Sequence, residues 1–201
     1  MINEQSKIKN QKSKFAFKEW AVICAALADG RQSLILRKGG IAEGPAGFQV
    51  EHDEFWLFPT YVHQQADALS AEAHPLFEQV QHDQPSGDLV PISLYAVVDE
   101  VIEVRESIVL PSLTGLHVWS DRTVHQRFHY KRLGLFVLPV RIYALPETIV
   151  IPNSPHFAGC RTWVPLPNDL STTDLKPVLS DEDFSRHLTA IQVATSPIRL
   201  A

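Results

Sequence analysis

The N-terminal part of the chain shows a helical pattern. Phe17, Trp20, Cys24 and Leu27 recur at intervals of three and four residues, which predicts a helix that carries these side chains on one face. Gly30 follows directly, and glycine commonly ends a helix because it tolerates positive φ. The sequence therefore predicts a helix that stops just before residue 30.

A pair of strands is predicted next. Apolar residues dominate 32–38 and 48–58, and residues 39–47 between them include four glycines and a proline, the composition of a loop. We expect the two strands to form a hairpin with a long connection.

The rest of the chain mixes helices and strands without the regular alternation of a parallel sheet. Helices are predicted at 61–73, after Ser120, and at 180–192; strands are predicted at 92–104, 133–145 and 147–152. The proline-rich segment 152–169 is expected to be a loop with one short strand. The predicted fold class is α+β, with a mixed or mainly antiparallel sheet that can curl into a barrel and three to four flanking helices.

Length and composition indicate one folded domain. The chain has 201 residues, of which 45% are hydrophobic, enough to form a substantial core. We expect a disordered tail at 1–14, an α+β domain at 15–167 and a C-terminal extension with a short helix at 168–201. No apolar run reaches the length that spans a bilayer, and the polar N-terminus does not look like a secretory signal.

The two cysteines and the net charge narrow the functional classes. Cys24 and Cys160 are far apart in sequence and are too few for a disulfide framework, which favours the cytoplasm. The net charge of −5 argues against a strongly basic nucleic-acid module but leaves a local basic patch open. No cofactor is predicted.

The first candidate site surrounds the glycine-rich loop. Arg37 and Lys38 precede the loop and can bind phosphate together with its backbone N–H groups, although strand geometry points the two side chains to opposite faces. Glu51, Asp53 and Glu54 follow the loop and can bind a divalent cation or act as a base. The alternative is a hairpin whose solvent-exposed end carries mixed charges.

The second candidate site is the helix predicted after Ser120. Four basic residues share one of its faces, at spacings of three and four: Arg122, His125, His129 and Arg132. This stripe can lie along a phosphate backbone, or it can be an ordinary solvated face. The two histidines have the spacing of a metal pair, but no glutamate follows the first and no cysteine is near, so no metal site is predicted here.

Two tryptophans complete the candidates. Trp119 and Trp163 both flank predicted turns, where an indole ring can line a pocket and stack on a base. The alternative is that both rings fill the core.

Four phrases of the sequence resemble an uncharacterised bacterial family, domain of unknown function 1802: "FKEWAVICAAL", "LILRKGGIAE", "FWLFPTYVHQ" and "GCRTWVPL". The resemblance covers roughly 15–167. It implies no established activity; reported fusions of such domains to restriction-endonuclease-like domains imply an accessory role near foreign DNA. A second resemblance, of "LADGRQSLILRKGG" to the opening of PUA-like domains of the ASCH group, implies a small β-barrel that binds RNA or modified bases.

Three functions remain open at this point. The leading hypothesis is a non-catalytic domain that binds nucleic acid or a nucleotide-like ligand. The first alternative is a metal-dependent enzyme acting on a nucleotide or phosphoester through the carboxylates of Glu51, Asp53 and Glu54. The second is a structural protein, such as a homodimer, without ligand chemistry.

Overall fold

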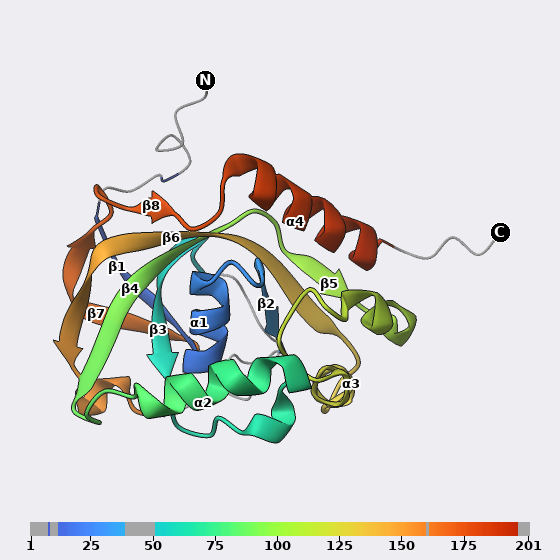
Figure 1. Cartoon of the computed structure of the whole chain (residues 1–201), viewed down its shortest axis with the longest axis horizontal. Helices are drawn as coiled ribbons and strands as arrows, with labels where there is room; N and C mark the ends of the chain where they lie inside the picture. The colour runs from blue at the N-terminus through green and yellow to red at the C-terminus, as the bar shows by residue number, and fades with distance from the viewer. Residues whose placement is uncertain (1–7, 9–11, 39–50, 160, 197–201) are drawn as a thin grey trace.

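The structure, a computed structural model, describes residues 8, 12–38, 51–159 and 161–196, and Figure 1 shows its arrangement. Its eight strands form one sheet in the order β2-β6-β4-β3-β1-β7, with β5 and β8 also paired to β6. The strands are β1 (Lys12–Trp20), β2 (Leu34–Arg37), β3 (Glu54–Thr60), β4 (Leu89–Val98), β5 (Ile102–Val104), β6 (Leu135–Pro152), β7 (Trp163–Ser171) and β8 (Lys176–Pro177). The pair β1 and β3 is parallel and the other described pairs are antiparallel, so the predicted α+β class with a mixed sheet is confirmed.

Four α-helices accompany the sheet in the described part of the chain. They are α1 (Ala21–Ala28), α2 (His74–His82), α3 (Asp121–His129) and α4 (Asp181–Thr195), and short 3₁₀ turns occur at η3 (Ala66–Ala68), η4 (Ala71–Ala73), η5 (Ser107–Leu113) and η6 (Pro155–Phe157). None of the described helices is both long and apolar enough to cross a membrane. The described pairings do not join β2 to β7, so the sheet curls around α1 without closing into a barrel (Figure 1).

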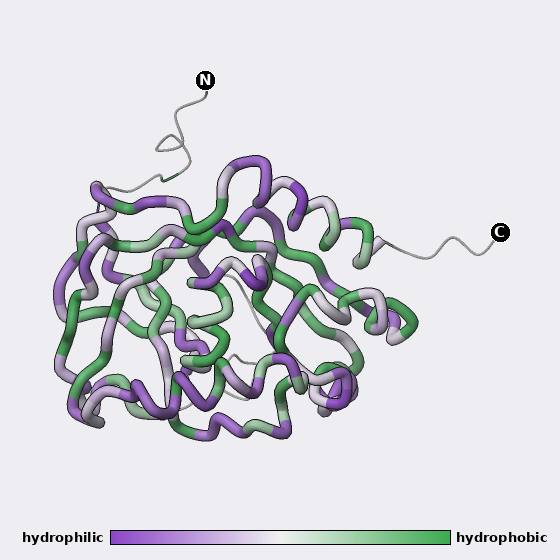
Figure 2. The backbone as a smooth tube through the Cα atoms, viewed as in Figure 1, coloured by the Kyte–Doolittle hydropathy of each residue, from purple (hydrophilic) through white to green (hydrophobic). Residues whose placement is uncertain are grey.

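Two hydrophobic cores lie on opposite faces of β1 and β3. Alternation along each strand sends Phe17 and Phe55 into the larger core around α1, and Ala16 and Trp56 into the smaller one beside β7. Figure 2 shows the consequence: α1 is hydrophobic along its whole length, whereas the outer helices α2 and α4 mix hydrophobic and hydrophilic positions.

The predicted N-terminal helix is wrong in its first half. Residues 12–20 form β1, and the helix occupies only Ala21–Ala28. The reason is long-range pairing: Phe17 lies opposite Leu57 of β3 on one side and Trp163 of β7 on the other. Gly30 does stop the helical segment, with a positive φ of 67°.

The predicted hairpin between 32–38 and 48–58 is also wrong. Both strands exist, but β2 pairs with β6, and β3 pairs with β1 and β4. The glycine-rich loop at 39–47 and most of the predicted tail at 1–14 lie outside the described residues, although β1 already begins at Lys12.

Later elements differ mainly in their lengths. The two strands predicted at 133–145 and 147–152 are one 18-residue strand, β6. The helix predicted at 61–73 is replaced by η3 and η4, and α2 follows with a proline in its first turn. The predicted cap is confirmed: the side chain of Ser120 accepts a hydrogen bond from the Thr123 N–H at the start of α3.

The sheet topology brings several strand ends to one edge. Because β1 and β3 are parallel, their C-terminal residues Trp20 and Thr60 lie side by side. Strand β4 runs opposite to β3, β6 opposite to β4, and β7 opposite to β1, so β4 and β7 begin at this edge and β6 ends there. Loops that leave or enter all five strands therefore meet at the same place.

Candidate functional site

A large pocket opens at this shared edge of the sheet. Its volume is about 790 Å³, within the range of sites that bind small molecules. It is lined by the ends of β1 and β3, by the turn after β3, by the α2–β4 connection and by the chain between β6 and β7. Arg37 reaches it from β2 and Arg127 from α3.

Positive side chains outnumber negative ones in the described lining. Lys18, Arg37, Arg127 and Arg161 line the pocket, against the single carboxylate of Glu19. The whole chain carries a net charge of −5, so the pocket has the opposite sign to the molecule. Such a local reversal attracts an anionic ligand.

Glu19 and Arg37 form a largely buried ion pair in the pocket wall. Their closest side-chain atoms, Oε2 of Glu19 and Nη2 of Arg37, are 3.4 Å apart, and only 4% of the Glu19 side chain is exposed. Nη2 of Arg37 also donates to the backbone carbonyl of Lys18, and the guanidinium lies 4.2 Å from the centre of the Phe17 ring. The Nε of Arg37 is buried without a hydrogen-bond partner among the described residues.

Arg127 is held by tryptophan rings. Its guanidinium carbon lies 3.6 Å from the centre of the Trp119 ring and 5.9 Å from that of Trp20, and the two indoles contact each other at 4.7 Å. Burial lowers the pKa of Arg127 to about 10, opposed by the charge of Glu19 and assisted by that of Arg37. Within the described chain, no carboxylate lies within ion-pair distance of this guanidinium.

Lys18 lies on the face of β1 opposite to that of Phe17 and Glu19. Its Nζ donates to the backbone carbonyls of Phe157 and Gly159, the latter at 3.1 Å, and lies 5.8 Å from the centre of the Phe58 ring. These contacts attach the segment after β6 to β1. They also hold the Lys18 ammonium group in the pocket wall, as a further cation beside Arg37 and Arg127.

Lys38, a predicted phosphate ligand, has a different environment from its neighbour Arg37. Its Nζ donates to the backbone carbonyls of Phe128, Arg132 and Gly134, at 3.0 Å for Phe128 and 2.7 Å for Gly134. Burial, together with the charge of Arg132, lowers the pKa of Lys38. The ammonium group thus satisfies carbonyls at the C-terminal end of α3.

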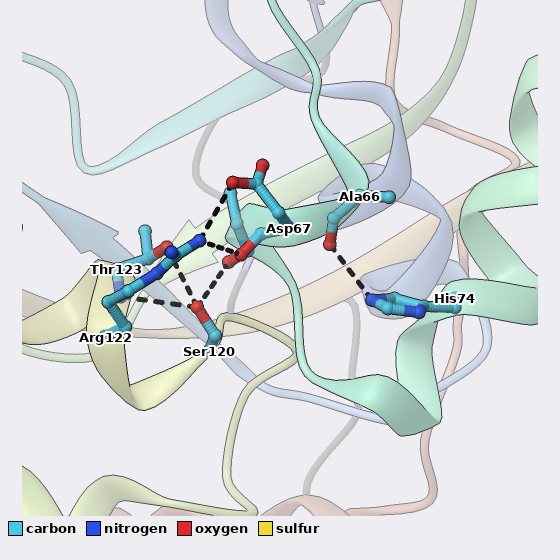
Figure 3. A network of polar contacts seen from close by, with 7 residues as sticks. Ala66, Asp67, His74, Ser120, Arg122 and Thr123 are labelled. Atoms are coloured by element: carbon cyan, nitrogen blue, oxygen red, sulfur yellow. Dashed lines mark hydrogen bonds and ion pairs between the residues drawn. The ribbon is translucent and has the colours of Figure 1, made fainter.

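The predicted basic stripe on α3 faces away from the pocket. Arg122 pairs with Asp67 at 2.8 Å and also donates to its backbone carbonyl, beside the Ser120 cap (Figure 3). The His125 and His129 rings are exposed and pack against each other at 4.1 Å. Arg132 is exposed as well, and no member of the stripe lines the pocket.

The two predicted stacking tryptophans occupy different places. Trp119 is 2% exposed and serves as the platform under Arg127 rather than as an open surface. Trp163 is half-buried and packs edge-on against Phe17 and Phe55, with His52 as another neighbour. Neither ring lines the pocket.

The acidic residues of the metal hypothesis do not form a ligand set. Glu51 and Asp53 are exposed, whereas Glu54 is buried in β3 close to Tyr95. Nowhere in the described parts of the chain do three His, Cys, Asp or Glu side chains come together in a way that could hold a metal ion.

Four charged residues of the pocket were missed by sequence reasoning: Lys18, Glu19, Arg127 and Arg161. The first two were hidden because residues 15–20 read as part of a helix. Arg127 did carry a signal: it lies three residues after Val124 and one before Phe128, on the apolar side of α3. A charged residue on the buried face of an amphipathic helix is unusual and points to a partner or a ligand.

A family model matches most of the chain. The model of "Domain of unknown function (DUF1802)" matches residues 16–190. The chain belongs to the DUF1802 family. A search of curated proteins gave no match for this DUF1802 chain.

Solved structures similar to the DUF1802 chain include ASCH from Zymomonas mobilis. That protein is 9% identical, with a TM-score of 0.40, and the match covers 88% of the DUF1802 chain and 94% of the ASCH chain. One point mutant of it gives 10% identity and a TM-score of 0.41, over 87% and 96% of the two chains. These neighbours carry the name of the ASCH group, which the sequence around residues 27–40 also resembles.

Proposed function

We propose that the pocket binds a small anionic ligand of the nucleotide type, with a phosphate group at Arg127 and Arg37 and an aromatic base against the apolar wall. The observation that carries this proposal is Arg127: a guanidinium stacked on Trp119, lining a pocket of about 790 Å³, with no carboxylate within ion-pair distance in the described chain. The Glu19 carboxylate, whose charge favours the charged form of Arg127, is paired with Arg37. Desolvating an arginine without neutralising it is costly, and an anion bound in the pocket would offset that cost.

Guanidinium groups suit phosphate particularly well. Their planar N–H donors match two phosphate oxygens at once, and stacking on an indole leaves the N–H edge available. Arg37 and Arg127 both line the pocket, and in this proposal both guanidinium groups contact one phosphate. Glu19 holds Arg37 in place through their ion pair and acts as a positioning residue.

The remaining wall suits an aromatic ring. Trp20, Phe58, Tyr61 and Phe157 all line the pocket and offer the apolar faces on which a base can pack. Burial raises the pKa of Tyr61, so its hydroxyl stays protonated and can donate a hydrogen bond to the ligand.

Isothermal titration calorimetry with nucleoside monophosphates and the corresponding nucleosides tests this function. We expect at least one monophosphate to bind, and its nucleoside to bind at least tenfold more weakly. Arg127→Met keeps a long apolar side chain over Trp119 and removes the charge, so the loss of charged hydrogen bonds should cost about 1.5–3 kcal/mol of binding free energy.

The matched control is Arg132→Met, which removes an exposed arginine just beyond the same helix and outside the pocket. It should leave the affinity unchanged. The proposal fails if nucleosides bind as well as their monophosphates, or if the two variants lose affinity equally.

A further inference from the structure

The partners of the arginines over the molecule indicate what size of ligand the pocket takes, and this inference rests on the proposed function. We infer that the pocket takes a free phosphorylated molecule of mononucleotide size rather than one nucleotide of a nucleic-acid strand. Cations inside the pocket are available to one small ligand, whereas a strand would also need cations outside it.

Outside the pocket, most described arginines are already neutralised. Five of them form an ion pair with a nearby carboxylate, at distances that include 2.8 Å for Arg122 and Asp67 and 2.6 Å for Arg141 and Asp181. The other three such arginines are Arg31, Arg105 and Arg186. Arg141 is buried and out of reach of a strand, and a strand bound to the surface would have to compete with carboxylates for each of the other four guanidinium groups.

The guanidinium groups without a carboxylate partner concentrate in the pocket. Among the described arginines, Arg127, Arg132 and Arg161 lack such a partner, and two of these three line the pocket. The described guanidinium groups that lack a carboxylate partner therefore lie mainly in a space that fits one small ligand.

The rim of the pocket is partly apolar, although the exposed Arg161 also belongs to the lining. Val62 and Leu89 are 70% and 42% exposed, so a strand that left the pocket on their side would meet apolar side chains. Lys38, which could have extended the basic surface along α3, is occupied by three backbone carbonyls.

The charge of the whole molecule points the same way. With 23 acidic and 18 basic residues, the chain repels a polyanion at most of its surface, whereas one phosphate group inside the pocket meets only the local field. Binding of a strand depends on many phosphate contacts and on the release of counterions, and most described arginines outside the pocket are already paired with carboxylates.

The test compares the best-binding monophosphate with a 5′-phosphorylated single strand of eight nucleotides containing the same base, by calorimetry at 50 mM and 200 mM salt. We expect the strand to bind no more than threefold more tightly than the monophosphate, and the affinity for the monophosphate to change less than threefold between the two salt concentrations. Arg127→Met should weaken binding of both ligands at least tenfold.

A double variant, Lys131→Met with Arg132→Met, removes the exposed cations that follow α3 and lie outside the pocket. It should change neither affinity, and since both side chains are exposed the fold is expected to tolerate the change. Circular dichroism and the melting temperature confirm that each variant is folded before titration.

The outcomes separate the two proposals. If the strand binds at least tenfold more tightly, falls steeply in affinity with salt and is weakened by the double variant, this inference is wrong and the nucleotide pocket stands. If neither the monophosphates nor the strand bind, the proposed function itself is wrong. Binding of monophosphate that survives Arg127→Met unchanged overturns both.

Discussion

Acidification should destabilise the protein through a single buried histidine, His117. This residue lies in the connection between η5 and α3, is 7% exposed, and neither of its ring nitrogens has a hydrogen-bond partner among the described residues. Burial lowers the pKa of His117 to about 4; Asp121 and nearby backbone groups favour the charged form, and these effects are smaller than the burial.

The magnitude follows from the difference between the folded and unfolded states. The unfolded chain binds a proton at this histidine with a pKa of about 6.5, so between pH 6.5 and pH 4 the unfolded state holds more protons than the folded state. The contribution of the neutral, buried His117 to the unfolding free energy is fully present above pH 6.5 and is lost as the pH falls from 6.5 towards 4. The loss from this residue between pH 8 and pH 5 is about 2 kcal/mol, equivalent to a fall in melting temperature of roughly 4–8 °C.

Urea unfolding at pH 8, 7, 6 and 5, followed by tryptophan fluorescence, measures this loss, because Trp56 and Trp119 are buried and report on the fold. His117→Leu removes the titrating group without breaking a hydrogen bond, so its unfolding free energy should fall by about 2 kcal/mol less than that of the wild type over the same range. His82→Leu, at an exposed position on α2, is the control and should keep the wild-type dependence. If His117→Leu shows the same pH dependence of the unfolding free energy as the wild type, the explanation by burial of His117 is refuted.

Three further substitutions test structural roles by thermal unfolding. Lys38→Met removes the donor to the carbonyls of Phe128, Arg132 and Gly134, of which the Phe128 carbonyl keeps the Gly134 N–H, and should cost about 1–3 kcal/mol while ligand affinity stays within twofold. Lost affinity with an unchanged melting temperature would instead place Lys38 in the binding site. Ser120→Ala removes the cap of α3 and should cost about 1 kcal/mol, with Ser112→Ala in η5 as an exposed control. Gly30→Ala should cost about 1–2 kcal/mol, because φ is +67° and the new Cβ would lie 2.6 Å from Leu179 Cδ2; an unchanged melting temperature would show that the turn relaxes freely.

The sequence pattern predicted the element types best where local signals and tertiary contacts agree. Ser120 caps α3 and Gly30 ends the α1 segment, and both depend only on the residues beside them. The first half of the predicted N-terminal helix failed because Phe17 and Trp20 also fit a strand that is completed by β3 and β7, one of them more than a hundred residues away. A pattern inside one segment carries no information about partners at that distance.

The prediction of the pocket residues was limited by the same element, β1. Arg37 was a candidate from its position at the end of an apolar strand, and it does line the pocket. Lys18 and Glu19 look like the polar side of a helix when residues 15–20 are read as helical, and only the parallel register with β3 brings them to the edge where the pocket opens. On α3, attention to the exposed face selected Arg122 and overlooked Arg127 on the opposite side.

Two arginines that are half-buried or buried differ in whether a carboxylate neutralises their charge. Arg141 is almost fully buried, yet Asp181 meets its charge at 2.6 Å and the carbonyl of Leu179 accepts a further hydrogen bond, so it fastens α4 to the sheet. Arg127 has indole rings instead of a carboxylate and a pKa lowered by burial, beside a pocket. An acidic chain has ample carboxylates with which to neutralise such a group. Because Arg127 has no ion-pair partner of its own among the described residues and lines a pocket that a small molecule can enter, we assign its missing partner to the ligand rather than to the fold.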